Sequence, residues 1–362
     1  MQLDNRNHEA LERYLRSVLH QDVRVLALRM LGEPEEGKGF GYGKPVCVEY
    51  ELPDTRRRSS AVLHTMGPGS FGHEHMADRA RILLWSHHAF NQLPRHVRSL
   101  DVGGFEPTGS LISLGDVEEF CLLTEFAEGQ PYALDLERLH DSGQLTDLDI
   151  ARADALCDYL VEIHAERGSD SRLYVRRNRE LVGDGECIMG LTDSYPDHPL
   201  FTAGVLEHIE HSAVAWRWRL KNRVHRLRRV HGDFHPWNIL FDAGAEFRVL
   251  DRSRGEYGDP ADDVTCITIN YLFFSLQRAG RLDGAFERLF LRFWDRYLEK
   301  TGDQEIFEVA APFLVFRALV LASPVWYPQL EDATRHKLLT FILNVLEQDC
   351  FDPREVHAYC GT

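Results

Sequence analysis

The stretch VHGDFHPWNILFD, residues 230–242, places two histidines, a carboxylate and a carboxamide in one short segment between apolar residues. His231, Asp233 and Asn238 form the pattern HxDxxxxN, and Asp251 follows thirteen residues later, at the end of an expected strand. Phosphoryl transfer from a nucleotide needs a carboxylate that orients the acceptor hydroxyl and oxygen ligands that hold magnesium on the phosphates. A loop between a helix and a strand can present Asp233 and Asn238, and the next strand end can present Asp251. The residue types and their spacing therefore predict a site for phosphoryl transfer.

The residues that precede this segment predict a small β-rich part. Alternating or β-prone apolar runs indicate strands and 3.6-residue periodicity indicates helices. The expected strands are 23–31, 46–52 and 60–66, and the expected helices are 8–19 and 76–90. A glycine-rich segment, 32–44, lies between the first two strands, where its backbone NH groups could approach phosphates. A flexible turn without ligand contact is the alternative.

The later residues predict a large helical part. EEFCLLTEF, residues 118–126, looks like a strand, and the following AEGQPYALD has the Gly and Pro of a linker. Helices are then expected over 148–167, 211–229 and 261–280, with more between 283 and 349. We therefore expect a nucleotide-binding domain, 1–128, and a helical domain, 129–362, that carries the catalytic loop and the acceptor site. Such an order leaves a cleft for a nucleotide.

Two motifs together carry a family resemblance. VHGDFHPWNILF and the later VLDRSRGEYGDPADDV resemble the aminoglycoside phosphotransferase and choline kinase family. This resemblance implies an α+β, two-lobed, protein-kinase-like fold and an enzyme that uses Mg²⁺ with ATP or GTP as co-substrate. It implies that Asp233 is the catalytic base and that Asn238 and Asp251 are the magnesium ligands.

The resemblance also assigns roles outside the catalytic loop. Glu125, Phe126 and Ala127 fall where the family's connector contacts adenine, mostly through backbone groups. Asp262 or Asp263 falls where the family has an acidic residue after the GDP motif. We interpret this carboxylate as structural, because a helix N-terminus favours a negative charge.

The third expected strand departs from the family pattern. The family usually has a Lys or Arg there, which reaches the nucleotide phosphates, whereas SAVLHTM places His64 at that position. A neutral imidazole has a shorter reach and no fixed charge near pH 7. Three explanations stay open: His64 does the work, Lys38 or Lys44 supplies the charge, or phosphate contact is weak and transfer is slow. The ion-pair partner on the next helix is also open: Glu74 and Asp78 are candidates, and Asp78 fits the helical pattern better. An exposed helix carboxylate without this role is the alternative for Asp78.

The segment 173–196 lies in the family's acceptor-binding region. Glu186, Asp193 and Tyr195 could face a polyhydroxyl or amine group of an acceptor. A structural loop with a buried Cys187 is the alternative. The leading hypothesis is thus a kinase that phosphorylates a hydroxyl of an antibiotic- or metabolite-like small molecule. The alternative is a nucleotide-binding, pseudokinase-like regulatory protein with little or no transfer.

Composition limits the partners. A net charge of −16 over 362 residues argues against nucleic acid and leans weakly toward cationic acceptors, although it is foremost a solubility feature. The seven Lys and Arg of 216–230 are typical of a solvated helix face whose charges pair with acidic residues. Seven scattered cysteines indicate reduced thiols in the cytoplasm, and no apolar run is long enough to span a membrane. The acceptor, the choice between ATP and GTP, and the oligomeric state stay open.

Overall fold

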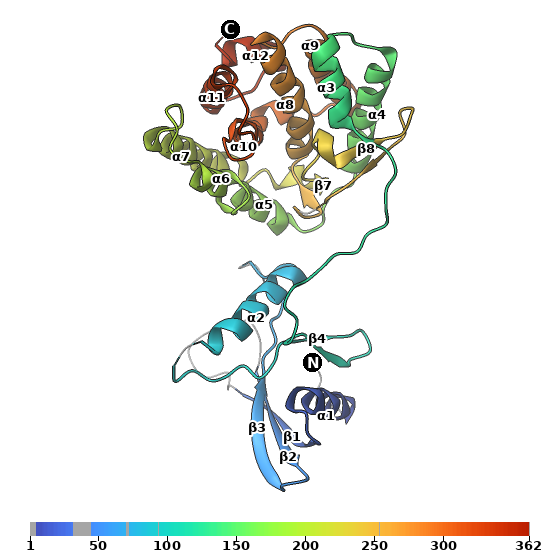
Figure 1. The fold of residues 1–362 in the computed structure, drawn as a ribbon, viewed down its shortest axis with the longest axis vertical. Coiled ribbons are helices and arrows are strands. Elements are labelled where there is room, and N and C mark those ends of the chain that lie inside the picture. Colours follow the sequence, from blue (N-terminus) through green and yellow to red (C-terminus); the bar gives the residue numbers. More distant parts are fainter. Residues whose placement is uncertain (1–4, 32–44, 70–71, 93, 253, 362) are drawn as a thin grey trace. The chain divides into compact units, whose positions relative to one another are not determined.

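The computed structural model describes residues 5–31, 45–69, 72–92, 94–252 and 254–361. The chain forms two compact units, 1–124 and 125–362, here called the first and the second unit (Figure 1). The glycine-rich segment 32–44, with Lys38 and Lys44, lies outside the described residues.

The first unit is built on an antiparallel sheet of order β1-β2-β3. Its strands are Arg24–Met30, Val46–Leu52 and Arg57–Leu63. Helix α1 (Asn5–Leu19) buries Leu11 and Leu15 against Val48 and Tyr50 of the central strand. The three strands confirm the prediction from alternating hydrophobicity, with the third beginning three residues earlier than expected.

A helix and a hairpin complete the first unit. Helix α2 (Met76–Phe90) has the predicted bounds and begins with a capping box, in which the backbone NH of His75 donates to Asp78 at 2.8 Å. The hairpin consists of β4 (Gly103–Phe105) and β5 (Leu111–Ser113).

The strand expected over 118–126 is absent from the structure. These residues form neither helix nor strand and pair with no strand among the described residues. Leu122 and Leu123 are 89% and 95% exposed. The prediction was wrong because apolar composition favours a strand only where a neighbouring strand is available for pairing.

The second unit is mainly helical. Its α-helices are α3 (Tyr132–Ser142), α4 (Asp147–His164), α5 (Ser171–Gly183), α6 (Ile188–Ser194), α7 (Ala203–Leu220), α8 (Pro260–Ala279), α9 (Gly284–Thr301), α10 (Ala310–Ala322), α11 (Asp332–Leu346) and α12 (Val356–Tyr359). Single 3₁₀ turns are η1 (Val224–Arg226), η2 (Pro236–Asn238), η3 (Gln304–Glu308) and η4 (Pro353–Glu355). Its short strands are β6 (Gln130–Pro131), β7 (Arg228–Arg229), β8 (Ile239–Phe241), β9 (Phe247–Val249) and β10 (Tyr257–Gly258). They form a sheet of order β6-β8-β9 and a separate β7-β10 pair.

Helix α8 is the centre of the second unit and packs against α3, α9 and α10 (Figure 1). The side chain of Asp259 caps its first turn by accepting the NH of Ala261 at 3.0 Å, and Pro260 occupies the first helical position. Gly280 ends it in a left-handed conformation, φ +67°. All residues from 260 to 276 are buried, so the expected buried helix ending at Gly280 is confirmed.

The helix expected over 211–229 has different bounds. Helix α7 begins at Ala203 and ends at Leu220, and the rest forms η1 and β7. The chain leaves the helix because Arg226 turns inward to bind Asp259 and Asp303. The basic run does pair with acidic residues, as expected: Arg219 with Asp349, Arg223 with Glu305, Arg226 with Asp259, and Arg229 with Glu166.

The structure confirms the α+β class, with a small β-rich first unit and a larger, mainly helical second unit. The assignment of nucleotide binding to 1–128 and of the acceptor to 129–362 stays a prediction. No helix in the described part of the chain is long and apolar enough to cross a membrane.

Candidate active site

The segment between β7 and β8, here called the catalytic loop, carries the predicted constellation. It is held at one end by the pairing of β7 with β10 and at the other by the pairing of β8 with β9. Gly232 adopts φ +85°, and a side chain there would come within 3.2 Å of the Cβ of Arg254. The turn before Asp233 therefore requires glycine.

A buried carboxylate of α8 anchors this turn. Asp263 accepts the backbone NH groups of His231 and Gly232, both at 2.7 Å. His164 lies with Nε2 at 3.1 Å from Asp263 and with Nδ1 at 2.8 Å from the hydroxyl of Tyr297. Burial alone would raise the pKa of Asp263, but the hydrogen bond and charge of His164 hold it below the ordinary value. Asp263 thus has the structural role that its place in the first helical turn predicted.

Asp233 is buried and its two carboxylate oxygens have different surroundings. Oδ1 accepts a hydrogen bond from Nη1 of Arg317 at 2.5 Å and lies 3.7 Å from Nε of Arg254. Oδ2 lies 3.4 Å from Nδ2 of Asn238 and 3.6 Å from Nε2 of His235.

These surroundings determine the charge of Asp233. Burial raises the pKa of its carboxyl, but nearby charges, that of Arg317 first, outweigh burial and hold the pKa below its ordinary value. Burial also lowers the pKa of His235. Asp233 is therefore ionised at neutral pH, as a general base must be, beside a neutral imidazole.

The structure brings Asn238 and Asp251 to the same place. Asn238 donates Nδ2 to the backbone oxygen of Asp233 at 3.1 Å, which leaves its Oδ1 available as a ligand. The NH of Leu250 donates to the backbone oxygen of Asn238 at 2.8 Å, so Asp251 follows β9 beside η2. Asp251 is exposed, and no hydrogen bond or ion pair engages its carboxylate among the described residues. A carboxamide oxygen and a carboxylate fit the preference of Mg²⁺ for oxygen ligands.

The remaining predicted site residues lie apart from this loop in the chain. His64 follows β3 directly in the first unit and is exposed, and Lys38 lies outside the described residues. Glu125, Phe126 and Ala127 form an extended segment that leads into β6, with Phe126 90% exposed. Their contacts with a nucleotide stay predictions.

The predicted acceptor region, 173–196, is helical rather than a loop. The hydroxyl of Tyr195 is buried and donates to the backbone oxygen of Leu319 at 2.6 Å, so Tyr195 cannot face an acceptor as expected. Asp193 is exposed. Cys187 is buried, and burial raises the pKa of its thiol to about 11, which makes it a poor nucleophile.

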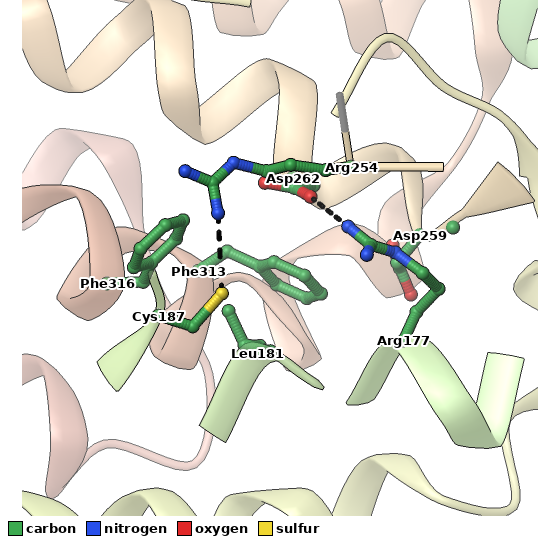
Figure 2. A pocket seen from close by; sticks show the side chains of 9 residues that line it. Arg177, Leu181, Cys187, Arg254, Asp259, Asp262, Phe313 and Phe316 are labelled. Carbon is green, nitrogen blue, oxygen red and sulfur yellow. Dashed lines mark hydrogen bonds and ion pairs between the residues drawn. The ribbon is translucent and has the colours of Figure 1, made fainter. Parts of the chain in front are cut away.

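A small pocket adjoins the base on this side (Figure 2). Arg254 reaches into it from the turn before β10, with Nη1 at 3.5 Å from Sγ of Cys187. Asp262 also lines the pocket, with Oδ2 at 3.8 Å from Nη2 of Arg177. Its other lining side chains are Leu181, Asp259, Phe313 and Phe316.

Sequence reasoning missed Arg317, which contacts Asp233 from 84 residues away. It lies on α10, whose sequence AAPFLVFRALVLA carries no other charge. A single charged residue in an otherwise apolar helix indicates a buried ion that needs a partner. The sequence of α10 could therefore have predicted that Arg317 is buried and paired, but not that its partner is Asp233.

Comparisons with known proteins point to one family. A family model described as "Phosphotransferase enzyme family" matches residues 78–299, a range that includes Asp233, Asn238 and Asp251. No curated protein matches this sequence.

Several solved structures are similar at low identity. An amicoumacin kinase in complex with AMP-PNP and Ca²⁺ is 13% identical, with 91% of each chain covered and a TM-score of 0.42. A choline kinase from Streptococcus pneumoniae is 11% identical, with 93% of this chain and 98% of that chain covered and a TM-score of 0.35. A glucosamine kinase is 17% identical, with 64% of this chain covered and a TM-score of 0.29. In that alignment this chain spans only 56% of the kinase. Because these TM-scores are low, the family of this chain is assigned from the family model that matches residues 78–299.

Proposed function

Because the chain belongs to the phosphotransferase enzyme family, we propose that it transfers the γ-phosphoryl group of ATP or GTP to a hydroxyl of a small molecule. The observation that carries the proposal is an ionised Asp233 in one loop with Asn238, beside the strand end that presents Asp251. The acceptor class, antibiotic- or metabolite-like, follows from the sequence resemblance.

Asp233 would orient the acceptor hydroxyl and receive its proton. The acceptor oxygen then forms a bond to the γ-phosphorus, the bond from this phosphorus to the β–γ bridging oxygen breaks, and a nucleoside diphosphate leaves. Burial of Asp233 suits this role, because a base that is screened from water keeps its orientation toward a single donor.

Asn238 and Asp251 would hold Mg²⁺, which when bound neutralises charge on the phosphates. Among the described residues, Oδ1 of Asn238 and the carboxylate of Asp251 are oxygen ligands that would suit this ion. His64, or Lys38, would contact the phosphates, and Glu125, Phe126 and Ala127 would contact the base of the nucleotide.

The first experiment measures the thermal shift of the protein with Mg·ATP and with Mg·GTP, beside Asp251→Ala. Linkage gives about 2.7 kcal/mol of stabilisation at a hundredfold excess of ligand over Kd, which is a shift of several degrees. We expect the shift in the wild type and its loss in Asp251→Ala. No shift with either nucleotide would contradict the proposed site.

The second experiment tests the base, with a screen of hydroxyl acceptors and with water as acceptor. Asp233→Asn should lower turnover by about 10²–10⁴-fold, because proton transfer to a positioned base contributes that factor. It should keep the nucleotide-induced thermal shift. Asp349→Asn, which changes an exposed carboxylate outside the candidate active site, should keep full turnover. Full turnover in Asp233→Asn would refute the assignment.

A nucleotide-binding regulator with little transfer is the second candidate, and His64 is the observation that favours it. The position directly after β3 holds an exposed imidazole where the resemblance leads us to expect a Lys or Arg. The variant His64→Lys separates the two functions. A sharp rise in transfer would mean that the natural protein is held at low activity, whereas a fall would mean that His64 already serves the phosphates.

A further inference from the structure

We propose that Arg317 is a positioning residue: it fixes Oδ1 of Asp233 and leaves Oδ2 as the oxygen that receives the acceptor proton. The inference rests on the proposed role of Asp233 and adds a residue that the family match does not reach, because α10 lies beyond residue 299.

The guanidinium of Arg317 binds the catalytic loop at two points. Nη1 donates to Oδ1 of Asp233 at 2.5 Å, and Nη2 donates to the backbone oxygen of Gly232 at 2.8 Å. One planar group thus holds both the carboxylate of the base and the backbone of the residue before it. A contact of this kind restricts rotation of the carboxylate as well as its position.

Helix α8 also holds the guanidinium, through Asp262. Nη2 of Arg317 also donates to Oδ1 of Asp262 at 2.9 Å, and the guanidinium carbon lies 4.5 Å from the ring centre of Phe316. Arg317 is 6% exposed and Asp262 is 6% exposed. The guanidinium is therefore held in the interior, and its bonds connect the base to α8 through Asp262 and to α10, the helix that carries Arg317.

The two oxygens of Asp233 become inequivalent as a result. Oδ1 is engaged by Arg317 and has Arg254 as a second cation at 3.7 Å. Among the described residues, Oδ2 contacts Asn238 at 3.4 Å and His235 at 3.6 Å, both longer than a strong hydrogen bond to a carboxylate. Oδ2 is therefore the less strongly engaged oxygen, and we place the acceptor hydroxyl on its side.

Lysine cannot replace this arrangement fully. Arg317 serves three oxygens, those of Asp233, Gly232 and Asp262, from one rigid fork. A lysine ammonium is a point charge on a flexible stem and keeps the charge without the orientation. The rate should therefore fall in the order Arg, Lys, Met.

The test is a double-mutant cycle between Arg317→Met and Asp233→Asn. Turnover is measured as phosphate release from Mg·ATP with water as acceptor, and KM for Mg·ATP is measured in parallel. We expect Arg317→Met to lower kcat by about 10²-fold, the loss that a misplaced reacting group causes, with KM unchanged. Arg317→Lys should recover part of this loss. In the Asp233→Asn background the same Arg317→Met change should lower kcat by less than about twofold, because the base through which it acts is gone.

Arg335→Met is the matched control. Arg335 is equally buried in the second unit, on α11, but donates to the backbone oxygens of Ala322 and Tyr327 instead of to Asp233. Its loss should change stability and leave the effect of Asp233→Asn on kcat intact. A full additional loss of kcat from Arg317→Met in the Asp233→Asn background would reduce Arg317 to a structural role and overturn the inference.

The two levels of the proposal fail in different ways. A wild type that binds Mg·ATP but releases no phosphate and phosphorylates no acceptor contradicts the proposed function. In that case the melting temperatures of the two single variants and of the double variant are compared. Additive changes in melting temperature would show that Arg317 and Asp233 are not coupled, and would overturn the inference. If Arg317→Met does not fold, the kcat of Arg317→Lys tests the positioning role instead. A kcat equal to that of the wild type in Arg317→Lys would overturn this role.

Discussion

The carboxylate of Asp263 accepts two backbone NH groups of the catalytic loop, so the turn before the base depends on a side chain of α8. Charge-assisted bonds of this kind are about twice as strong as neutral ones, and both lie in the interior. Local sequence could indicate a structural carboxylate after the GDP motif. It could not indicate which NH groups that carboxylate would bind, because His231 and Asp263 are 32 residues apart.

We predict that Asp263→Asn destabilises the second unit by about 1–3 kcal/mol, because one carboxylate oxygen becomes an NH₂ group that faces an NH donor. Urea unfolding monitored by tryptophan fluorescence measures the change, since Trp216 and Trp294 are both buried in this unit. Asp193→Asn is the control and should leave the free energy of unfolding within experimental error. Equal stability of Asp263→Asn and wild type would contradict the anchoring role.

At the scale of elements, the turn η1 connects three parts of the helical unit. Arg226 donates Nε to Oδ2 of Asp259 at 2.8 Å and Nη1 to Oδ1 of Asp303 at 2.7 Å. Asp259 caps α8, and Asp303 follows α9. The same Arg226 therefore explains why α7 ends before the basic run does, and why periodicity alone gave the wrong helix end.

We predict that Arg226→Met lowers the free energy of unfolding by about 3–5 kcal/mol, because it leaves the buried carboxylate of Asp259 without its cation. Arg219→Met, from the same basic run, is the control. Its partner Asp349 is exposed, so this change should cost less than about 1 kcal/mol. Similar losses in both variants, measured by urea unfolding, would show that the burial of the Arg226 pair has no special effect.

The elements that could be predicted from sequence are those whose signals are local. Helix α8 has its cap, its proline and its terminal glycine within the segment itself. The stretch 118–126 has no cap, proline or terminal glycine of this kind, and its apolar residues pair with no strand among the described residues. In the candidate site the same distinction holds: Asp233, Asn238 and Asp251 follow from one motif, whereas Arg317 reaches the base only through the packing of α10 on α8.

At the scale of the molecule, buried carboxylates determine how stability depends on pH. Burial raises the pKa values of Asp259 and Asp263, but Arg226 and His164 respectively hold them below the ordinary value of 3.8. Such groups contribute stability above pH 3.8, and the contribution is lost as the pH falls through the lower, folded-state pKa. Burial raises the pKa of Asp262, so its ionisation opposes folding above pH 3.8 and its protonation on acidification favours folding.

We therefore predict that these carboxylates cause no loss of stability between pH 7 and pH 5, and a steep loss below about pH 3.8. Urea unfolding at pH 7, 5 and 3 measures this dependence. In Asp262→Asn, the gain on acidification toward pH 3.8 should disappear, while the loss below pH 3.8 should remain. A wild type that loses most of its stability by pH 5 would contradict this assignment of charges.

Asp251 has a backbone conformation that carries a stability cost. Its φ of +51° lies in the left-handed region, which costs even Asp, one of the side chains that tolerate this region best, up to about 1 kcal/mol relative to glycine. Asp251→Gly should therefore raise the melting temperature of the protein without ligand, while it removes one of the two oxygens proposed for the metal. A directed-evolution experiment that selected only for thermostability would enrich this substitution and produce proteins that no longer bind Mg·ATP, so any such selection needs a nucleotide-binding step in every round.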